Sequence, residues 1–214
     1  MSIRIIGGAY KRRELRGPSG TEVTRPLPAR VRESLFNMLL GHVEGEAVFD
    51  GFAGVGTFGL EAASRGAREV VMVERDRGSA KVLRRNARDL GALDDVGGVC
   101  RVVEADVLGP AGLASCPEPV HLVYLDPPYP LVRDAVGRGR VLGQLARLIG
   151  RLDSTGYAML RTPWPFTGGA GGGGGGGVEG RVDVSDELGA VSGAEGPETH
   201  VYGTTAVHLF MRSG

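Results

Sequence analysis

The segment best suited to bind a small ligand is a glycine-rich stretch that follows an apolar run ending near residue 50. Glycines at positions 54, 56 and 59 match the pattern GxGxxG, between a predicted strand and a predicted helix. Such glycines let the backbone approach a bound nucleotide, and Glu74, at the end of the next apolar run, can accept both hydroxyls of a ribose. The pattern predicts a nucleoside cofactor, and NAD and S-adenosylmethionine both fit it. Glycines that only pack a helix against a strand are the alternative interpretation.

A second candidate site is the tetrapeptide Asp-Pro-Pro-Tyr at residues 126–129, directly after the apolar run 120–125. The two prolines restrict φ and remove two amide donors, so the turn is stiff. It presents the Asp126 carboxylate and the Pro127 carbonyl, which can accept the two N–H groups of an exocyclic amine, while a tyrosine ring can stack on the base. The predicted catalytic residues are therefore Asp126, Pro127, Pro128 and Tyr129.

Apolar runs that alternate with helical patterns are expected to place these two segments side by side. Strands are predicted over 47–50, 69–74, 99–104, 120–126 and 156–161, and helices over 57–65, 76–90 and 133–152, with a connector over 110–117. Strands that are apolar throughout are buried on both faces, so the alternation predicts a parallel sheet covered by helices on both sides. Ligands bind at the carboxyl edge of such a sheet, where both candidate segments lie.

The two ends of the chain follow a different pattern. Residues 2–6 and 10–15 predict a short β-hairpin, and an amphipathic helix is predicted from Pro28 to Leu40. Near the carboxyl terminus, strands are predicted over 181–187 and 205–211, with a tight turn at Tyr202 and Gly203. We expect these last strands to add an antiparallel part to the edge of the sheet.

Composition sets broad limits. The chain has 214 residues, 25 basic and 25 acidic, and 42% are hydrophobic, which indicates one folded domain rather than a disordered chain. No apolar run is long enough to span a bilayer, so we expect a soluble, cytoplasmic protein with no membrane partner. The two cysteines form no CxxC pair and the four histidines are far apart in sequence, so no metal site is expected. Asp94 and Asp95 are interpreted as turn residues.

The amino-terminal region is basic although the whole chain is neutral. Residues 1–40 contain eight basic and three acidic residues. Such an arm is typical of contact with a polyanion, but a solvated hairpin would show the same charges. We therefore predict a hairpin arm over 1–24 and a main domain over 25–214, in which the glycine-rich stretch 168–177 forms a flexible insertion.

In these motifs the sequence resembles the small-subunit (16S) ribosomal RNA guanine-N2 methyltransferases. The resemblance rests on residues 4–8, 24–26, 30–37, 52–67, 125–129 and 202–204, and it covers most of the chain except about 162–198. It implies a Rossmann-like fold that binds S-adenosylmethionine, with a mostly parallel seven-stranded sheet, an antiparallel carboxyl-terminal strand and the hairpin arm. The sequence departs from the family pattern at 27–29 and at Arg161, where the family often has an acidic residue.

The resemblance also implies roles for individual residues. Glu74 would hold the ribose, Asp106 the adenine amine, and Asp50 with Gly54 and Gly56 the methionine end of the cofactor. The expected cofactor site further includes Phe52, Thr57 and Arg75. Basic residues of the arm and the first helix would contact phosphates of the RNA: Lys11, Arg12, Arg13, Arg16, Arg25, Arg30 and Arg32.

The implied reaction is methylation of the N2 amine of a guanine in 16S rRNA, either free or in a small-subunit assembly particle, by a monomer. Three alternatives remain at this point. Adenine-N6 DNA methyltransferases share the Asp-Pro-Pro-Tyr motif, an NAD oxidoreductase would share the glycine-rich loop, and a non-catalytic assembly protein would bind RNA without transferring a methyl group.

Overall fold

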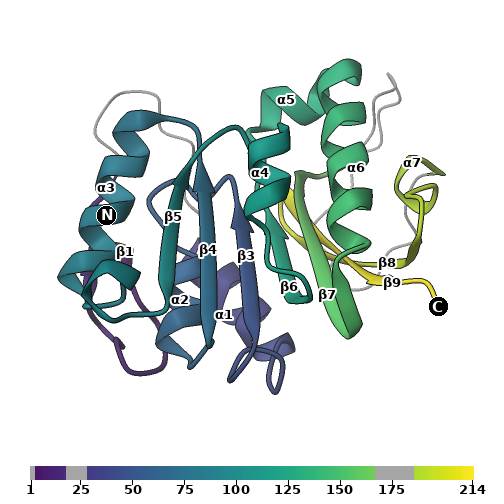
Figure 1. Cartoon of the computed structure of the whole chain (residues 1–214). Coiled ribbons are helices and arrows are strands. Elements are labelled where there is room, and N and C mark those ends of the chain that lie inside the picture. The colour runs from purple at the N-terminus through teal and green to yellow at the C-terminus, as the bar shows by residue number, and fades with distance from the viewer. Residues whose placement is uncertain (1–2, 18–27, 167–185) are drawn as a thin grey trace.

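The computed structural model describes residues 3–17, 28–166 and 186–214, which form a mixed β-sheet flanked by helices (Figure 1). The strands are β3 (Ala47–Gly51), β4 (Glu69–Glu74), β5 (Cys100–Glu104), β6 (Val120–Leu125), β7 (Leu152–Pro163), β8 (Ala194–Tyr202) and β9 (Thr205–Arg212). Their order across the sheet is β5-β4-β3-β6-β7-β9-β8. Strands β3 to β7 are parallel, and β9 runs antiparallel to both β7 and β8. The predicted fold class is confirmed.

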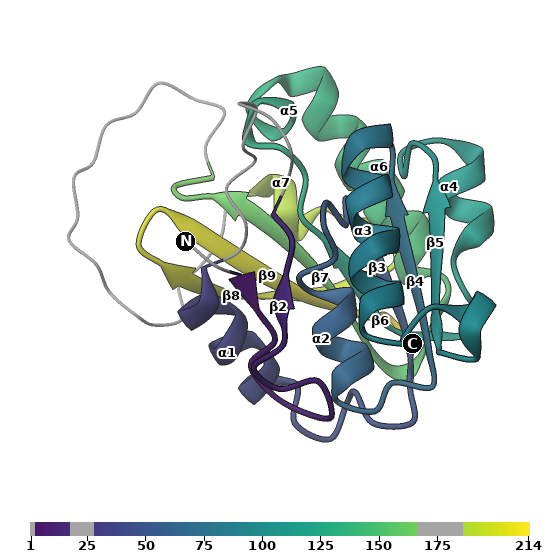
Figure 2. The same cartoon turned by 90° about the vertical axis from the view of Figure 1, so that its left-hand side faces the viewer.

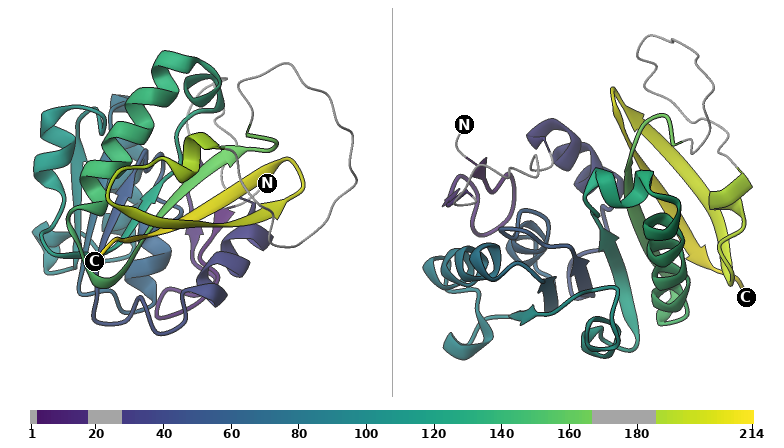
Figure 3. Two further views of the ribbon diagram at one scale, coloured as in Figure 1. Left: turned by 90° about the vertical axis from the view of Figure 1, so that its right-hand side faces the viewer. Right: turned by 90° about the horizontal axis from the view of Figure 1, so that it is seen from above.

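Helices cover both faces of this sheet, as the view from above shows (Figure 3). One face carries α1 (Ala29–Met38), α2 (Gly59–Ser64) and α3 (Arg77–Asp89), and the other carries α4 (Pro110–Ser115), α5 (Tyr129–Arg133) and α6 (Ala135–Ile149). Side chains alternate along each strand, so Val48 packs with the first layer and Phe49 with the second. Two apolar cores result, one on each side of the sheet.

Several predicted elements differ from the observed ones. The connector over 110–117 contains α4, and the helix predicted over 133–152 is two helices, because Asp134 ends α5 and caps α6 by accepting a hydrogen bond from the Gly137 amide at 2.7 Å. The strand predicted over 181–187 is wrong in its described part, since Asp186–Gly189 form helix α7, while residues 181–185 lie outside the described residues. The glycine-rich stretch 168–177 also lies outside them.

Strand β8 was not predicted from the sequence. Gly196 and Pro197 lie inside it, and both residue types argue against a regular strand. The structure accommodates them at the outer edge of the sheet, where the pairing of β8 with β9 shifts register between Glu195 and Glu198. Asp94–Val96 form a short 3-10 turn, in agreement with the interpretation of its two aspartates. In the described ranges, no helix is both long and apolar enough to cross a membrane.

The amino-terminal hairpin is part of the core. Strands β1 (Ile3–Arg4) and β2 (Glu14–Leu15) pair antiparallel and lie beside α1 and α2 (Figure 2). The side chain of Glu61 on α2 is 0% exposed, and its two carboxylate oxygens accept hydrogen bonds from the amides of Ile6 and Gly7, each at 2.8 Å. The hairpin is therefore held to the domain by a buried carboxylate.

Arg32 corrects one sequence prediction. Its side chain is 2% exposed, donates a hydrogen bond to the Arg4 carbonyl at 2.5 Å and lies 3.8 Å from a carboxylate oxygen of Glu61. Burial lowers the pKa of this guanidinium, while Glu61 opposes that shift. A buried arginine cannot contact the phosphates of an RNA, so Arg32 stabilises the fold instead of the predicted interface.

We expect Glu61→Ala to lower the free energy of unfolding by about 3 to 5 kcal/mol, because it leaves a buried arginine and two backbone amides without their partner. Chemical denaturation measures this change. The control is Glu14→Ala, since Glu14 forms an ion pair with Arg4 in which both side chains are more than half exposed (60% and 58%). That control should cost about 1 kcal/mol or less. Equal losses in the two variants would contradict the anchoring role of Glu61.

Candidate functional site

The two sequence-predicted segments meet at the carboxyl edge of the sheet, at the upper end of the strands in Figure 1. Strand β3 pairs with β4 on one side and with β6 on the other, so the segments that follow these three strands are neighbours. The amide of Asp126 donates a hydrogen bond to the Gly51 carbonyl at 3.3 Å. The Ala53 amide donates to the Val73 carbonyl at 3.0 Å. The Asp-Pro-Pro-Tyr turn and the glycine-rich loop thus lie on either side of the end of β3.

Glu74 connects the glycine-rich loop to the end of β4. One carboxylate oxygen accepts a hydrogen bond from the Gly54 amide at 2.8 Å, and the other accepts one from the Asp76 amide at 2.7 Å. Each oxygen of a carboxylate can accept a further hydrogen bond. The side chain is half-buried, so these remaining positions can serve the two hydroxyls of a ribose.

Asp50 is a buried carboxylate on β3, with 1% of its surface exposed. Burial, with a smaller contribution from the charges of Asp126 and Glu74, raises its pKa to about 8, although the amide of Gly59 donates a hydrogen bond to it at 2.9 Å that acts in the opposite direction. A side chain at position 59 could not fit, because its Cβ would lie 2.6 Å from Met72. No basic side chain of the described chain forms an ion pair with Asp50, which leaves this site suited to a cationic ligand group.

The loop between β3 and α2 has an unusual backbone. Phe52 has φ of 62°, a left-handed conformation that costs energy for a residue with a side chain, and Gly54 has φ of 57°. A Cβ at Gly54 would meet no atom within 4 Å, so there is open space above this part of the loop. Strained backbone of this kind is concentrated at binding sites.

The other predicted cofactor residues lie around this loop with different exposure. Thr57 is half-buried and Arg75 is exposed. Asp106, after β5, has 40% of its side chain exposed, and its carboxylate accepts a hydrogen bond from the Leu108 amide at 3.0 Å. Arg140 on α6 lies 3.5 Å from the other oxygen of that carboxylate. These residues border the same edge of the sheet, and their roles stay predictions.

Asp126 is held by a residue to which the sequence analysis gave no role. Arg161 on β7 places one guanidinium nitrogen 2.9 Å and 2.8 Å from the two carboxylate oxygens of Asp126. Its other terminal nitrogen donates to the Tyr129 hydroxyl at 3.1 Å, and its Nε donates to the Thr205 hydroxyl at 3.1 Å. The Tyr129 hydroxyl also donates to Thr205 at 2.9 Å. One arginine therefore orients both the carboxylate and the tyrosine of the motif.

Two opposing effects act on the pKa of Asp126 in its pair with Arg161. Burial raises the pKa of Asp126, and the guanidinium of Arg161 opposes that shift. Arg161 has 7% of its side chain exposed and Asp126 has 22%, so the carboxylate still reaches solvent on one side. A signal for this contact was present in the sequence, because Arg161 is a charged residue directly after the apolar run 158–160 in a buried strand.

The basic residues predicted to contact RNA separate into groups. Lys11 and Arg12 are exposed in the hairpin loop, and neither side chain forms an ion pair within the described residues. Arg13 donates a hydrogen bond to the Asp89 carbonyl at 2.7 Å, and Arg16 forms an ion pair with the Asp89 carboxylate at 3.2 Å. Arg30 is exposed on α1, whereas Arg25 lies outside the described residues.

Comparisons with known proteins agree with this geometry. Ribosomal RNA small subunit methyltransferase D of Haemophilus influenzae is 34% identical over 132 residues, which cover 59% of this chain and 64% of that protein. The protein of the same name from Escherichia coli K12 is 39% identical over 127 residues, which cover 59% and 60% of the two chains. The match therefore spans less than two thirds of either relative.

A solved structure extends the likeness to the whole fold. The yhhF protein of Escherichia coli has a TM-score of 0.71 and 27% sequence identity to this chain, with coverage of 100% of this chain and 99% of the other. The family described as Conserved hypothetical protein 95 matches residues 3–141. Because this match includes more than half of the sequence, the chain belongs to the Conserved hypothetical protein 95 family, in agreement with the resemblance to small-subunit ribosomal RNA methyltransferases that its motifs carry.

Proposed function

We propose that this protein is an S-adenosylmethionine-dependent methyltransferase that modifies the exocyclic N2 amine of a guanine in 16S rRNA. The observation that carries the proposal is the hydrogen bond from the Asp126 amide to the Gly51 carbonyl, which joins the Asp-Pro-Pro-Tyr turn to the strand that leads into the glycine-rich loop. An amine-binding turn and a nucleoside-binding loop thus share one edge. Relatives named ribosomal RNA small subunit methyltransferase D support the choice of RNA as substrate.

The residues present fit the proposed cofactor. S-adenosylmethionine supplies a methyl group activated on a sulfonium, and its methionine end carries an ammonium. Asp50 is a buried carboxylate without a basic partner in the described chain, and open space lies above Gly54. Glu74 retains acceptor positions for the ribose, and Asp106 for the adenine amine. Phe52, Gly56, Thr57 and Arg75 complete the proposed set.

Asp126 and the Pro127 carbonyl act on the amine. The lone pair of the guanine N2 nitrogen is delocalised into the ring, so acceptors for its two hydrogens favour the pyramidal, nucleophilic form as charge develops. When bound, the cofactor would supply the methyl group to this nitrogen and leave as a neutral thioether, and the released proton would pass to the Asp126 carboxylate or to solvent. Pro128 keeps the turn stiff, and Tyr129 supplies the stacking surface. Most of the rate gain comes from holding the reacting atoms about 3 to 3.5 Å apart and aligned.

The substrate must offer an unpaired guanine. An amine inside a base-paired helix cannot reach this edge, so the base comes from a loop or is flipped out of its stack. Lys11 and Arg12, with Arg13, Arg16, Arg25 and Arg30, supply the positive charge that we propose for phosphate contacts. Such contacts set the register of the RNA and carry no sequence information. We further propose that a monomer acts in the cytoplasm, with the arm 1–24 and the domain 25–214 both on the RNA.

The decisive experiment is to incubate the purified full chain with labelled S-adenosylmethionine and either free 16S rRNA or small-subunit assembly particles. Mass spectrometry of the nucleosides should reveal N2-methylguanosine. N6-methyladenosine in DNA would favour the adenine-N6 alternative, and binding of NAD would favour the oxidoreductase. RNA binding without transfer, in a preparation that binds the cofactor, would indicate a non-catalytic assembly protein.

The raised pKa of Asp50 predicts a pH dependence of stability. Because the folded-state pKa is about 8 and the ordinary value is 3.8, the folded protein retains a proton that the unfolded chain releases. Stability is therefore lost as pH rises from about 5 to 8, by about 1.4 kcal/mol per pH unit for this group. In Asp50→Asn this loss should be absent, and the variant should bind S-adenosylmethionine more weakly because it cannot pair with the ammonium.

Denaturation at several pH values, with calorimetry for the cofactor, measures both effects. The control is Asp95→Asn, at an exposed aspartate paired with Arg88 outside the site. If the wild type and Asp50→Asn lost stability in parallel between pH 5 and 8, the buried carboxylate would not be the titrating group.

Removal of the amine acceptor should affect turnover more than cofactor binding. In Asp126→Ala we expect turnover to fall at least about a hundredfold, because the acceptor acts mainly in the transition state. The affinity for S-adenosylmethionine should change little.

In Arg161→Met the pKa of Asp126 should rise further, so the acidic limb of the rate profile should move to higher pH.

The control for this pair is Arg212→Met, an exposed arginine at the end of β9. It should leave both turnover and the pH profile unchanged. Near-normal turnover in Asp126→Ala would remove the carboxylate from the mechanism, and an unshifted profile in Arg161→Met would show that Arg161 does not tune it.

The exposed charges of the hairpin loop give a prediction about RNA. The double variant Lys11→Gln/Arg12→Gln should bind 16S rRNA more weakly and lower the slope of log affinity against log salt by about 1.4 to 1.8, since each lost phosphate contact removes about 0.7 to 0.9. Titrations at several salt concentrations measure the slope. The charge-matched control is Arg147→Gln/Arg212→Gln, at exposed positions on α6, which covers the opposite face of the sheet, and at the end of β9. The same slope in both double variants would favour the solvated hairpin.

A further inference from the structure

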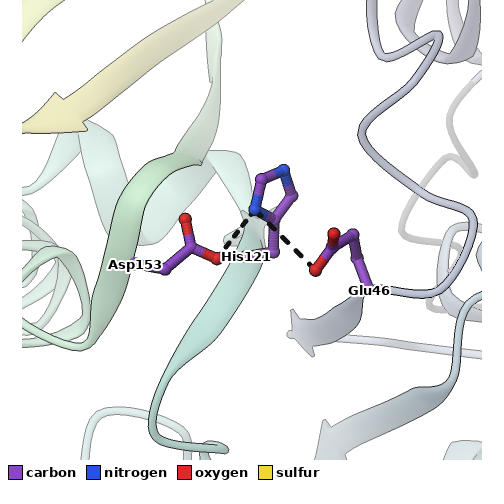
Figure 4. A group of neighbouring side chains, drawn as sticks. All are labelled: Glu46, His121 and Asp153. Atoms are coloured by element: carbon purple, nitrogen blue, oxygen red, sulfur yellow. Dashed lines mark hydrogen bonds and ion pairs between the residues drawn. The ribbon is translucent and has the colours of Figure 1, made fainter.

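Three side chains that could bind a metal meet at the amino edge of the sheet, opposite the candidate active site. They are Glu46, directly before β3, His121, the second residue of β6, and Asp153, the second residue of β7 (Figure 4). Strands β3, β6 and β7 are neighbours in the sheet, so the three residues come from adjacent strand ends. His121 is 5% exposed, whereas the two carboxylates are about one-third exposed (35% and 31%).

The distances in this cluster are close to those of a metal site. The His121 Nδ1 atom lies 2.8 Å from a carboxylate oxygen of Asp153 and 4.0 Å from one of Glu46. One atom of each residue lies within 4.8 Å of the others. Ligand atoms about 2.0 to 2.2 Å from a tetrahedral zinc are about 3.3 to 3.6 Å apart. To reach that spacing, the Nδ1 atom and the Asp153 oxygen would separate by about 0.5 to 0.8 Å, and the Glu46 oxygen would move about 0.4 to 0.7 Å closer to Nδ1.

Neighbouring groups orient two of these side chains. The other oxygen of Asp153 accepts hydrogen bonds from the amide and the hydroxyl of Thr155, at 2.9 Å and 3.3 Å. The His121 Nε2 atom lies 2.9 Å from the Nδ1 atom of His42. As the cluster stands, His121 Nδ1 donates its hydrogen bond to Asp153, and His121 Nε2 accepts one from His42. A metal bound at Nδ1 would displace that proton to solvent.

The charge of the cluster favours a cation. No lysine or arginine among the described residues forms an ion pair with Glu46 or Asp153. The two carboxylates therefore bring negative charge to the cluster that a bound cation would balance.

We propose that Glu46, His121 and Asp153 form a binding site for a divalent first-row transition metal of the zinc type. One imidazole nitrogen and two carboxylate oxygens suit Zn²⁺, and water would complete a tetrahedral shell. The metal would cross-link the amino ends of β3, β6 and β7, at the edge opposite the proposed methyl transfer. Its role is structural, and it takes no part in the reaction.

This proposal revises the sequence expectation of no metal site. His121 lies 75 residues after Glu46 and 32 before Asp153, and no short ligand motif connects them. The histidines were interpreted as separate residues, yet the structure brings His42 and His121 together with their ring centroids 5.2 Å apart. Only the order of the strands places these ligands at one point.

The test uses the full chain after treatment with a chelator. Calorimetric titration with Zn²⁺ should show one site per chain, and Co²⁺ should give the visible absorption of a tetrahedral complex. Asp153→Asn and Glu46→Gln should each weaken Zn²⁺ binding at least about tenfold, and His121→Gln at least about a hundredfold. Zn²⁺ should also raise the melting temperature of the wild type by several degrees and that of the variants by less.

The matched control is His200→Gln, because His200 lies 3.0 Å from Glu198 in another histidine–carboxylate pair but belongs to no three-ligand cluster within the described residues. It should bind Zn²⁺ as the wild type does. Glu46→Gln keeps the test valid if the buried His121 variant does not fold, because Glu46 is partly exposed. Lack of a stoichiometric site in the wild type, or Zn²⁺ binding in Glu46→Gln and Asp153→Asn that is as tight as in the wild type, would overturn the proposal and leave a hydrogen-bonded cluster.

Discussion

Strand β3 is buried along its whole length, because β4 and β6 flank it and apolar side chains cover both of its faces. The glycine-rich loop and the Asp-Pro-Pro-Tyr turn are both positioned by this strand. Its last residue, Gly51, leads into the glycine-rich loop and accepts a hydrogen bond from Asp126. Its one charged residue, Asp50, is fixed by the amide of Gly59 at the start of α2. A shift in the register of β3 would therefore displace the glycine-rich loop and the Asp-Pro-Pro-Tyr turn together.

The carboxylates of this edge differ in how their charge is balanced. Asp126 has Arg161 as a partner, so its orientation is set before a substrate arrives. Asp50 has no basic partner among the described residues, and its raised pKa reflects the cost of an unbalanced buried charge. Under the proposed function, the fixed Asp126 carboxylate would lower the reorganisation needed for methyl transfer, and the Asp50 carboxyl would gain a cationic partner when the cofactor binds.

Buried charge also connects the basic hairpin to the domain. Glu61 accepts hydrogen bonds from two hairpin amides and lies 3.8 Å from the buried Arg32, so part of the positive charge of residues 1–40 belongs to the core. Arg13 and Arg16 contact Asp89 at the end of α3. The hairpin is thus rigidly placed relative to the site, while Lys11 and Arg12 remain exposed at its loop. Under the proposed function, a hairpin held in this way would set the register of the RNA without contacting the reactive base.

Local sequence determined the elements and the chemistry of the two motifs. The runs over 69–74 and 120–125 are apolar on both faces, a pattern that buried parallel strands satisfy well. Prolines and glycines set the conformational freedom of their own backbone, so the stiff turn and the glycine-rich loop follow from local sequence. The tertiary structure decided the contacts between distant residues: Arg161 with Asp126, Arg32 with Glu61, and His121 with Asp153. It also placed β8, whose Gly196 and Pro197 are tolerated only because it is an edge strand. Hydrophobic periodicity reports the environment of each segment, whereas side-chain partners depend on strand order and register, which no short stretch of sequence contains.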